Sequence, residues 1–451
     1  MKAGNFTIQD VTIVNEGECY QASVLIEDGR IAEIVKNEER RTKNKSNHNS
    51  SLFTLNSSFL LPGIIDGHVH MREPGLTHKA TMESETRAAA RGGVTTVLDM
   101  PNVVPQTTTL QLLKERYALA EGRCHVNYGF YLGATNDNLE EIKRLDPSLC
   151  PGVKLFMGSS TGGMLVDREE TLRQIFRHSP TLVMAHCEDT ERIKENIDRI
   201  QNSKCKIQSD LPIRFHPLIR DHEACYRSSE LAVRLAKEEG ARLHVAHITT
   251  AKELELFQPG DEHITAEACV PHLLFTDADY ETLGARIKCN PAIKTAVDRD
   301  ALRKALTDGR VRTIATDHAP HLLSEKEGGC LKAMSGMPMV QFSLPAMLSL
   351  ADEGVLSIER VVELMCHNPA RLYHIKERGF IREGYWADFT LVRRKPWTVT
   401  QDCIESRCGW SPLEGRTLGW QVEKTWVNGN LVWDGQRVNT DIWGQAVTHS
   451  P

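Results

Sequence analysis

Six residues of the kinds that bind metal ions occur at the ends of short apolar runs in this 451-residue chain. They are His68, His70, Lys154, His186, His247 and Asp317. His68 and His70 are two positions apart, so on a strand both side chains point to the same face, as two ligands of one metal require. Imidazole and carboxylate ligands without a thiolate favour Zn²⁺ or a similar first-row ion. Such a set would support attack on a substrate by metal-activated water.

Each of these residues alone is weak evidence for a metal site. With 18 histidines in the chain, chance predicts on the order of one His-x-His pair. A lone strand-end histidine is more often a hydrogen-bonded packing residue, a lone aspartate before a helix is more often an N-cap, and a lysine in an apolar strand usually snorkels or forms an ion pair. Convergence on one pocket changes this interpretation, because burying so many polar groups without partners is costly and a metal ion supplies the partner.

The elements that must position these residues form a β–α pattern between about residues 61 and 375. Short apolar runs alternate with helical patterns, which is typical of parallel strands joined by helices. Eight such units favour a closed (β/α)8 barrel of the TIM type, in which the carboxyl ends of the strands share one pocket. An open doubly wound sheet needs a glycine-rich phosphate turn after its first strand, and the sequence has none there. The expected strands span residues 63–71, 95–102, 125–133, 152–158, 181–189, 242–250, 264–272 and 311–321.

Three of the expected helices have clear end signals. Residues 167–176 form an amphipathic pattern for which Asp167 is the expected N-cap. The helical patterns that end at Gly240 and Gly309 each have the residue that most often follows a helix. The glycine-rich segment 158–165 is either a mobile lid over the pocket or an ordinary β–α turn.

Both ends of the chain show strand patterns. The dipeptides Asp28-Gly29 and Asn428-Gly429 are typical of two-residue hairpin turns. We therefore expect residues 1–60 and 376–451 to pack together as one small β-sandwich beside the barrel of residues 61–375. Residues 36–51 are polar and lack periodicity, which favours an exposed loop over a basic binding patch.

The composition excludes several classes of protein. The formal net charge of −6 argues against an electrostatic interaction with nucleic acid. No apolar run approaches the roughly 18 residues of a membrane span, and the first residues lack the apolar core of a signal peptide. The 12 cysteines form no CxxC pair, which favours reduced thiols in a cytosol over a disulfide framework. We expect a cytoplasmic enzyme that has no membrane or nucleic-acid partner.

Seven motifs occur along the barrel in a fixed order: DGHVHMREPG, DMPN, VKLF, AHCED, AHIT, NPAIK and ATDHAPH. With them the chain resembles the dihydroorotases of the amidohydrolase superfamily over about residues 62–375. The histidines and Asp317 would by themselves indicate the superfamily. The narrower resemblance rests on Arg72, Asn102, Asn290 and the HAPH segment.

The resemblance implies two zinc ions per chain. His68, His70 and Asp317 would hold the more buried ion, and His186 and His247 would hold the other. Lys154 resembles the lysine that reacts with CO₂ to form a carbamate, whose two anionic oxygens would bridge both cations. Many bacterial relatives use an aspartate as the bridge instead, so Lys154 is similar to the branch with a carboxylated lysine.

The activity that the resemblance implies is the reversible cyclisation of N-carbamoyl-L-aspartate to L-dihydroorotate in de novo pyrimidine biosynthesis. Asp317 would take a proton from the attacking water and give it to the departing ring nitrogen. Arg72 would bind the substrate carboxylate as a bidentate fork, with Asn102 and His321 beside it. The dihydroorotases often form dimers, so a homodimer is the assembly that the resemblance suggests.

The remaining contacts that the resemblance implies are to the ring of the substrate. Asn290 and the backbone around Ser335 and Gly336 would hydrogen-bond that ring. Two alternatives stay open. One is another cyclic amidohydrolase, either an allantoinase or a dihydropyrimidinase or hydantoinase, whose substrates do not require Arg72. The other is a non-catalytic scaffold with the same barrel, against which the complete set of expected ligands counts.

Overall fold

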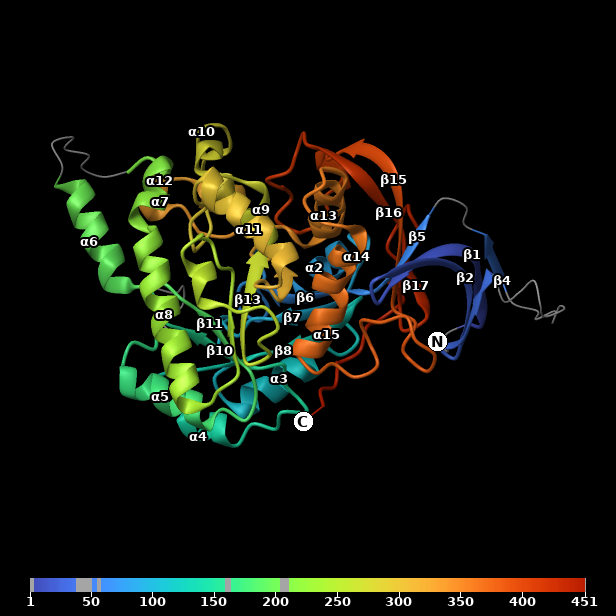
Figure 1. Cartoon of the computed structure of the whole chain (residues 1–451), viewed down its shortest axis with the longest axis horizontal. Helices are drawn as coiled ribbons and strands as arrows, with labels where there is room; N and C mark the ends of the chain where they lie inside the picture. Colours follow the sequence, from blue (N-terminus) through green and yellow to red (C-terminus); the bar gives the residue numbers. More distant parts are fainter. Residues whose placement is uncertain (1–3, 38–50, 55–57, 159–163, 203–210, 451) are drawn as a thin grey trace.

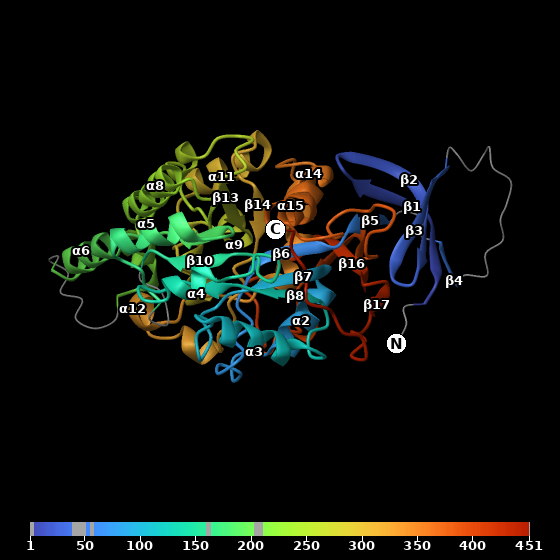
Figure 2. The same cartoon turned by 90° about the horizontal axis from the view of Figure 1, so that it is seen from below.

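The barrel expected from the sequence is present. The computed structural model describes residues 4–37, 51–54, 58–158, 164–202 and 211–450. Parallel strands lie at the centre of the larger part of the molecule and helices surround them (Figures 1 and 2). The barrel strands are β6 (Ile64–Val69), β7 (Val94–Asp99), β8 (Asn127–Phe130), β9 (Leu132–Gly133), β10 (Val153–Phe156), β11 (Val183–His186), β12 (Leu243–Val245), β13 (Ile264–Cys269) and β14 (Thr313–Ala315).

The barrel closes at two places between a six-stranded and a three-stranded parallel sheet. The third expected strand is divided at Tyr131, so that β8 pairs with β7 while β9 pairs with β10. On the other side, Val69 forms a parallel bridge with His318, and the His70 amide donates to the His318 carbonyl at 2.7 Å. These contacts join the first strand to the segment after the last one, which brings residues 68–72 beside residues 317–321.

Most helices follow the barrel strands in the expected alternation. They are α2 (Met82–Arg91), α3 (Leu110–Ala120), α4 (Leu139–Lys143), α5 (Glu169–His178), α6 (Thr190–Gln201), α7 (His216–Ile219), α8 (His222–Glu239), α9 (Val270–Leu274), α10 (Tyr280–Leu283), α11 (Ala296–Asp308), α12 (Gly329–Lys332), α13 (Ser343–Asp352), α14 (Ile358–Val362) and α15 (Asn368–Leu372). Between β12 and β13 there is one turn of 3₁₀ helix, Glu253–Leu256, in place of an α-helix.

Two of the three predicted helix-end residues lie where the sequence placed them. Gly240 and Gly309 follow α8 and α11 with φ of 69° and 90°, the left-handed conformation that ends a helix at low cost for glycine. The prediction that Asp167 is the N-cap is wrong. Helix α5 begins at Glu169, and Arg168 occupies the N-cap position without a side-chain hydrogen bond. Of the glycine-rich segment 158–165, residues 159–163 lie outside the described residues, as do residues 38–50 of the expected polar loop.

Strands from both chain ends form one mixed sheet beside the barrel (Figure 1). The strands are β1 (Phe6–Asn15), β2 (Glu18–Glu27), β3 (Arg30–Lys36), β4 (Ser51–Thr54), β5 (Phe59–Pro62), β15 (Phe389–Thr398), β16 (Thr417–Val427) and β17 (Asn430–Trp433). Their order is β17-β16-β15-β5-β1-β2-β3, and β4 pairs with β1. The division of the chain into units at about residues 60 and 375 stays a prediction.

The curvature of this sheet creates a small core of its own. Phe6 of β1 and Trp426 of β16 lie on strands that are not neighbours in the sheet, yet their rings stack with centroids 6.2 Å apart. The two expected hairpins are confirmed: Asp28 and Gly29 have φ of 48° and 81°, and Asn428 and Gly429 have φ of 51° and 74°. Positive φ at both central residues matches the turn type that suits the twist of paired strands.

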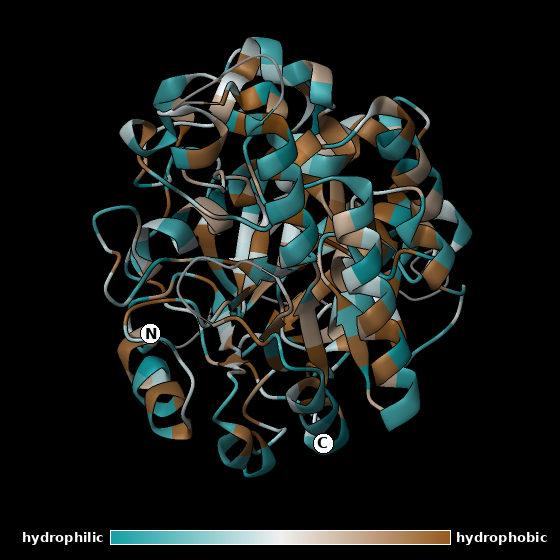
Figure 3. Ribbon diagram, turned by 90° about the vertical axis from the view of Figure 1, so that its left-hand side faces the viewer, coloured by the Kyte–Doolittle hydropathy of each residue, from teal (hydrophilic) through white to brown (hydrophobic). Residues whose placement is uncertain are grey.

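The closed end of the barrel is packed and the other end is open. Apolar strands lie at the centre of a ring of helices that turn hydrophilic faces outward (Figure 3). Tyr131 and Tyr373 fill the interior below the pocket, and the Tyr131 hydroxyl donates to the Gly67 carbonyl at 2.9 Å. A Cβ at Gly67 would lie 2.6 Å from the Tyr373 hydroxyl, so only glycine allows this packing directly before His68.

The cysteines in the described ranges are free thiols, and apart from Cys19 they are buried. No helix in those ranges is long and apolar enough to cross a membrane.

Candidate metal centre and active site

One cavity at the open end of the barrel collects the predicted site residues. It is lined by His68, His70, Arg72, Asn102, Lys154, Phe156, His186, His247, Asn290, Asp317, Ala319, Ser335 and Gly336. These residues come from strand ends and from the loops that follow them, as the barrel geometry requires. His321 is the one predicted residue outside this set; it lies behind Arg72.

His68, His70 and Asp317 form a compact group. Asp317 Oδ1 lies 3.3 Å from His68 Nε2 and 3.0 Å from His70 Nε2. The ligand atoms of these three residues all lie within 4.8 Å of one another. The first and last strand ends therefore present two imidazole nitrogens and one carboxylate to a common point, which is a set that a first-row metal ion accepts.

The outer nitrogens of these two histidines are held by oxygen atoms. His68 Nδ1 donates to Glu267 Oε1 at 2.8 Å, and His70 Nδ1 donates to Asn102 Oδ1 at 2.9 Å. Each bond orients the ring so that Nε2, the nitrogen facing Asp317, is the one available to a metal ion. A histidine ligand of a metal characteristically has such a partner, because the second hydrogen bond orients the ring and raises its basicity.

His186 and His247 form a second group beside the first. His186 Nδ1 lies 3.0 Å from His247 Nε2, and His186 Nε2 donates to Glu188 Oε2 at 3.1 Å. Glu188 also pairs with Arg220. The rings of His68 and His247 have centroids 5.3 Å apart, so the two groups share one site.

Lys154 lies in the same pocket, and its ammonium has no hydrogen-bond partner in the described part of the chain. Its side chain is fully buried, and its Nζ atom and His247 Nδ1 are both orphaned among the described residues. Burial lowers the pKa of the Lys154 ammonium. Burying an amine without a hydrogen-bond partner costs free energy. An anion formed at this position would lie beside both groups of imidazoles.

The carboxylates of the site are held in their ionised form. Burial alone would raise the pKa of Asp317, but the neighbouring His68 and His70 outweigh it and hold that pKa well below its usual range. The same competition lowers the pKa of Glu267 to about 2, since His68 and His244 face it. Burial also lowers the pKa of the His70 imidazole, to about 4.

Backbone strain concentrates in the same place. Arg72, His247 and Asp317 have positive φ of 66°, 35° and 48°. Non-glycine residues adopt this region rarely, and it recurs at ligand sites where the surrounding structure enforces it. Here all three lie just after a barrel strand, and the conformation directs their side chains into the pocket.

Arg72 is a buried cation held by neutral groups. It is 7% exposed; its Nε donates to the Pro320 carbonyl at 3.0 Å, and its Nη2 lies 2.9 Å from His321 Nε2. The same His321 nitrogen lies 3.0 Å from the Ser335 carbonyl oxygen. Burial lowers the pKa of Arg72 to about 10 and that of His321 well below its usual range. The pocket therefore has a guanidinium whose positive charge is not neutralised by these partners.

Sequence reasoning missed two of the supporting carboxylates. Glu267 lies in the middle of β13, where a charged residue in an otherwise apolar run was the available signal. Glu188 follows His186 by two residues in the AHCED motif. Both side chains are fully buried, and a buried carboxylate needs a partner that the local sequence does not reveal.

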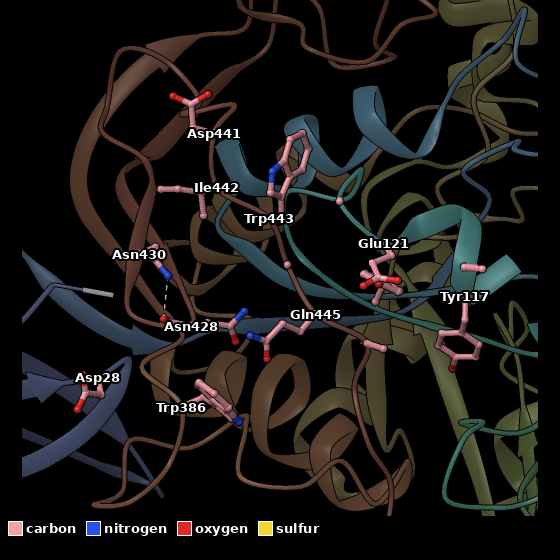
Figure 4. Close-up of a pocket in the computed structure, with 15 residues that line it drawn as sticks. Asp28, Tyr117, Glu121, Trp386, Asn428, Asn430, Asp441, Ile442, Trp443 and Gln445 are labelled. Carbon is pink, nitrogen blue, oxygen red and sulfur yellow. Dashed lines mark hydrogen bonds between the residues drawn. The ribbon is translucent and has the colours of Figure 1, made fainter. Parts of the chain in front are cut away.

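A second cavity, of about 1130 Å³, lies elsewhere in the molecule (Figure 4). Its walls come from α3, from the hairpin turns at Asp28 and Asn428, and from residues 441–446, with Trp386 and Trp443 among them. None of the predicted site residues, all of which the structure describes, lines it. Its larger volume therefore does not make it the candidate active site.

Comparison with known proteins identifies both the sequence relatives and the fold. Residues 59–432 match the model of the amidohydrolase family. A dihydroorotase of Halobacterium salinarum is 34% identical over 420 residues, which cover 92% of this chain and 96% of that protein. A dihydroorotase of Methanosarcina mazei is 30% identical over 449 residues, which cover 96% and 95%.

Solved structures with the same fold include two cyclic amidohydrolases of other names. The L-hydantoinase (dihydropyrimidinase) from Arthrobacter aurescens superposes with a TM-score of 0.90 and 26% identity, and the match covers 99% of this chain and 100% of that one. The dihydropyrimidinase from Brevibacillus agri gives a TM-score of 0.87 at 22% identity, with 99% and 100% covered. The second likeness shows the fold alone.

Proposed function

The chain belongs to the amidohydrolase family, and from that premise we propose that it is a dihydroorotase, a hydrolase acting on a cyclic amide. It interconverts N-carbamoyl-L-aspartate and L-dihydroorotate on the route to pyrimidines. Relatives of this name match most of the chain at 28–34% identity. The observation that carries the proposal within this family is Arg72, a buried guanidinium in the wall of a pocket of metal-binding side chains.

Arg72 matches the feature that separates this substrate from related rings. Dihydroorotate has a carboxylate outside its ring, whereas hydantoin and dihydrouracil have none. A planar guanidinium binds a carboxylate through two parallel hydrogen bonds. The amide of Asn102, whose oxygen already accepts from His70, would offer its N–H groups to the same carboxylate, and His321 would hold Arg72 from behind.

The residues present fit a pair of zinc ions bridged by an N-carboxylated Lys154. The three-residue group around Asp317 would hold one ion, and His186 with His247 would hold the other. Lowering the pKa of Lys154 favours its neutral amine, the form that adds to CO₂: a nitrogen–carbon bond forms and one proton is released. The resulting carbamate would give the orphaned Nζ region two anionic oxygens. When bound, the ions would lower the pKa of a water molecule and polarise the ring carbonyl.

Asp317 would move the proton. Its carboxylate is ionised and lies between His68 and His70 at the floor of the pocket. In ring opening it would accept a proton from the attacking water and pass it to the ring nitrogen as the carbon–nitrogen bond breaks; ring closure reverses these transfers. Asn290, whose Oδ1 has no partner among the described residues, and the Ser335–Gly336 backbone would hydrogen-bond the ring.

A substrate panel with metal counting tests the proposal. Purified protein loaded with zinc should interconvert carbamoyl aspartate and dihydroorotate faster than it hydrolyses hydantoin, dihydrouracil or allantoin. Faster turnover of one of the latter three would make it a different cyclic amidohydrolase. No turnover together with fewer than about one zinc ion per chain would favour a scaffold without activity.

The likeness to the L-hydantoinase, at 26% identity over nearly the whole chain, makes hydantoin hydrolysis the second candidate. Arg72 weighs against it, because a hydantoin ring offers this buried cation no carboxylate. We further propose that the protein acts in the cytoplasm, which agrees with its free thiols. We also propose that it acts on this small-molecule substrate and not on nucleic acid, which agrees with its slight net negative charge. Its proposed assembly is a homodimer.

A further inference from the structure

Two buried lysines lie behind the wall of the pocket that Ser335 and Gly336 form, and the chemistry proposed above uses neither of them. Lys326 is 6% exposed and Lys288 is 4% exposed. A buried ammonium is costly unless hydrogen bonds compensate it. Both ammonium groups are held by backbone carbonyls from the segments that build this wall.

Lys326 uses all three of its donors on main-chain oxygens. Its Nζ donates to the carbonyls of Met334 and Gly336 at 2.6 Å each and to the carbonyl of Lys288 at 3.1 Å. The first two carbonyls flank Ser335, whose own carbonyl oxygen lies 3.0 Å from His321 Nε2. The carbonyls on both sides of Ser335 are thus held from behind by one ammonium, and this fixes the direction in which the Ser335–Gly336 backbone faces the pocket.

The third bond of Lys326 connects the Ser335–Gly336 wall to the segment that contains Lys288 and Asn290. The Lys288 carbonyl also accepts from the Gly336 amide at 2.8 Å, and Lys288 Nζ donates to the Ala333 carbonyl. Asn290, which lines the pocket, follows Lys288 by two residues. The wall has little freedom to adjust, because a Cβ at Gly336, where φ is 132°, would lie 2.6 Å from the Ala319 carbonyl.

We propose that Lys326 is a positioning residue for substrate binding: its ammonium holds the Ser335–Gly336 wall against the Asn290 wall so that both face the substrate ring in one fixed geometry. The inference rests on the proposed function insofar as these residues are taken as ring contacts. Lys326 lines neither the pocket nor the groups of metal-binding side chains, so its loss should weaken substrate binding while leaving the metal centre intact.

The test compares two neutral variants of similar shape with an exposed control. Lys326→Met removes all donors, Lys326→Gln keeps two N–H donors, and Lys332→Met removes an exposed lysine from the same segment. For dihydroorotate we expect KM to rise about tenfold or more in Lys326→Met, since hydrogen bonds from a charged donor are lost. We expect kcat to stay within about threefold because the metal-binding groups are untouched. Lys326→Gln should lie between, and Lys332→Met should behave as wild type.

A second measurement does not depend on the substrate. Hydrogen exchange of the amides in residues 333–337 should be faster in Lys326→Met than in wild type, with Gly336 most affected because its bond to Lys288 loses support. If Lys326→Met does not fold, Lys326→Gln gives the same comparison. Wild-type exchange in both variants, or an unchanged KM, would overturn the inference. Equal losses of zinc, kcat and substrate binding would also overturn it, since they would indicate a general structural role.

The pH profile adds a third readout. Burial lowers the pKa of Lys326 to about 7, in surroundings that include Cys289, Lys288, Arg72 and Glu325. A neutral amine donates two hydrogen bonds where the ammonium donates three, so the wild-type KM should rise as pH increases above about 7. The rise due to Lys326 disappears in Lys326→Met, and what remains belongs to the other titrating groups of the site, Lys288 and Arg72 among them. Identical profiles would contradict the inference. Absence of dihydroorotase activity in wild type would refute only the proposed function, while the exchange experiment would still test Lys326.

Discussion

Replacing Arg72 by methionine should remove most of the discrimination in favour of a substrate with a carboxylate. The guanidinium is already held by the Pro320 carbonyl and by His321, so little ordering entropy is lost when a carboxylate binds. Each hydrogen bond between ionised groups stabilises by about 1.5–3 kcal/mol. Two parallel bonds at the lower end of this range give about 3 kcal/mol, which corresponds to a factor of roughly 100 in binding.

The assay measures kcat/KM for dihydroorotate and for dihydrouracil, which is the same ring without the carboxylate. Arg72→Met should lower the value for dihydroorotate about 100-fold while changing that for dihydrouracil by less than about threefold. Arg72→Lys should recover only part of the loss, because a point charge cannot form the bidentate pair. Zinc content and melting temperature serve as controls for folding. An unchanged KM for carbamoyl aspartate in Arg72→Met would refute the reasoning.

Three further predictions follow from the site and its surroundings. Asp317→Asn should lower kcat by at least about 100-fold at full zinc occupancy, and near-normal kcat would remove Asp317 from proton transfer. Native mass spectrometry should show the added mass of one CO₂ on Lys154, whereas a bare amine with both metal sites filled would refute the bridge. Burial lowers the pKa of His244 and His272 from 6.5 to about 4. Between pH 6.5 and pH 4 these histidines are therefore protonated in the unfolded chain and neutral in the native state. Their contribution to the free energy of unfolding is complete above pH 6.5 and is lost as the pH falls towards about 4. At pH 5 each histidine lowers the free energy of unfolding by about 2 kcal/mol. Urea unfolding at pH 7 and pH 5 measures this loss of stability. If His272→Gln left the loss unchanged, the role given to His272 would be contradicted.

The sequence by itself determined the architecture and which candidate metal ligands the barrel brings together. Strand and helix periodicities are local properties, so the eight β–α units and the two glycine hairpins could be predicted without coordinates. His68, His70 and Asp317 were recognisable because their types and their positions at strand ends are local as well. Once the strands close a barrel, all carboxyl ends must meet, and the meeting of these side chains follows from topology alone.

Only the tertiary structure decided what supports those residues. Glu267, which orients His68 from 199 positions away in the sequence, appeared locally as one charge in an apolar strand. His321 lies behind Arg72, not in the wall of the pocket, and Lys326 clamps three carbonyls that no pattern connects to it. The physical reason is the same in each case: periodicity states which face of an element is buried, whereas the partner that satisfies a buried polar atom comes from whichever distant segment packs against that face.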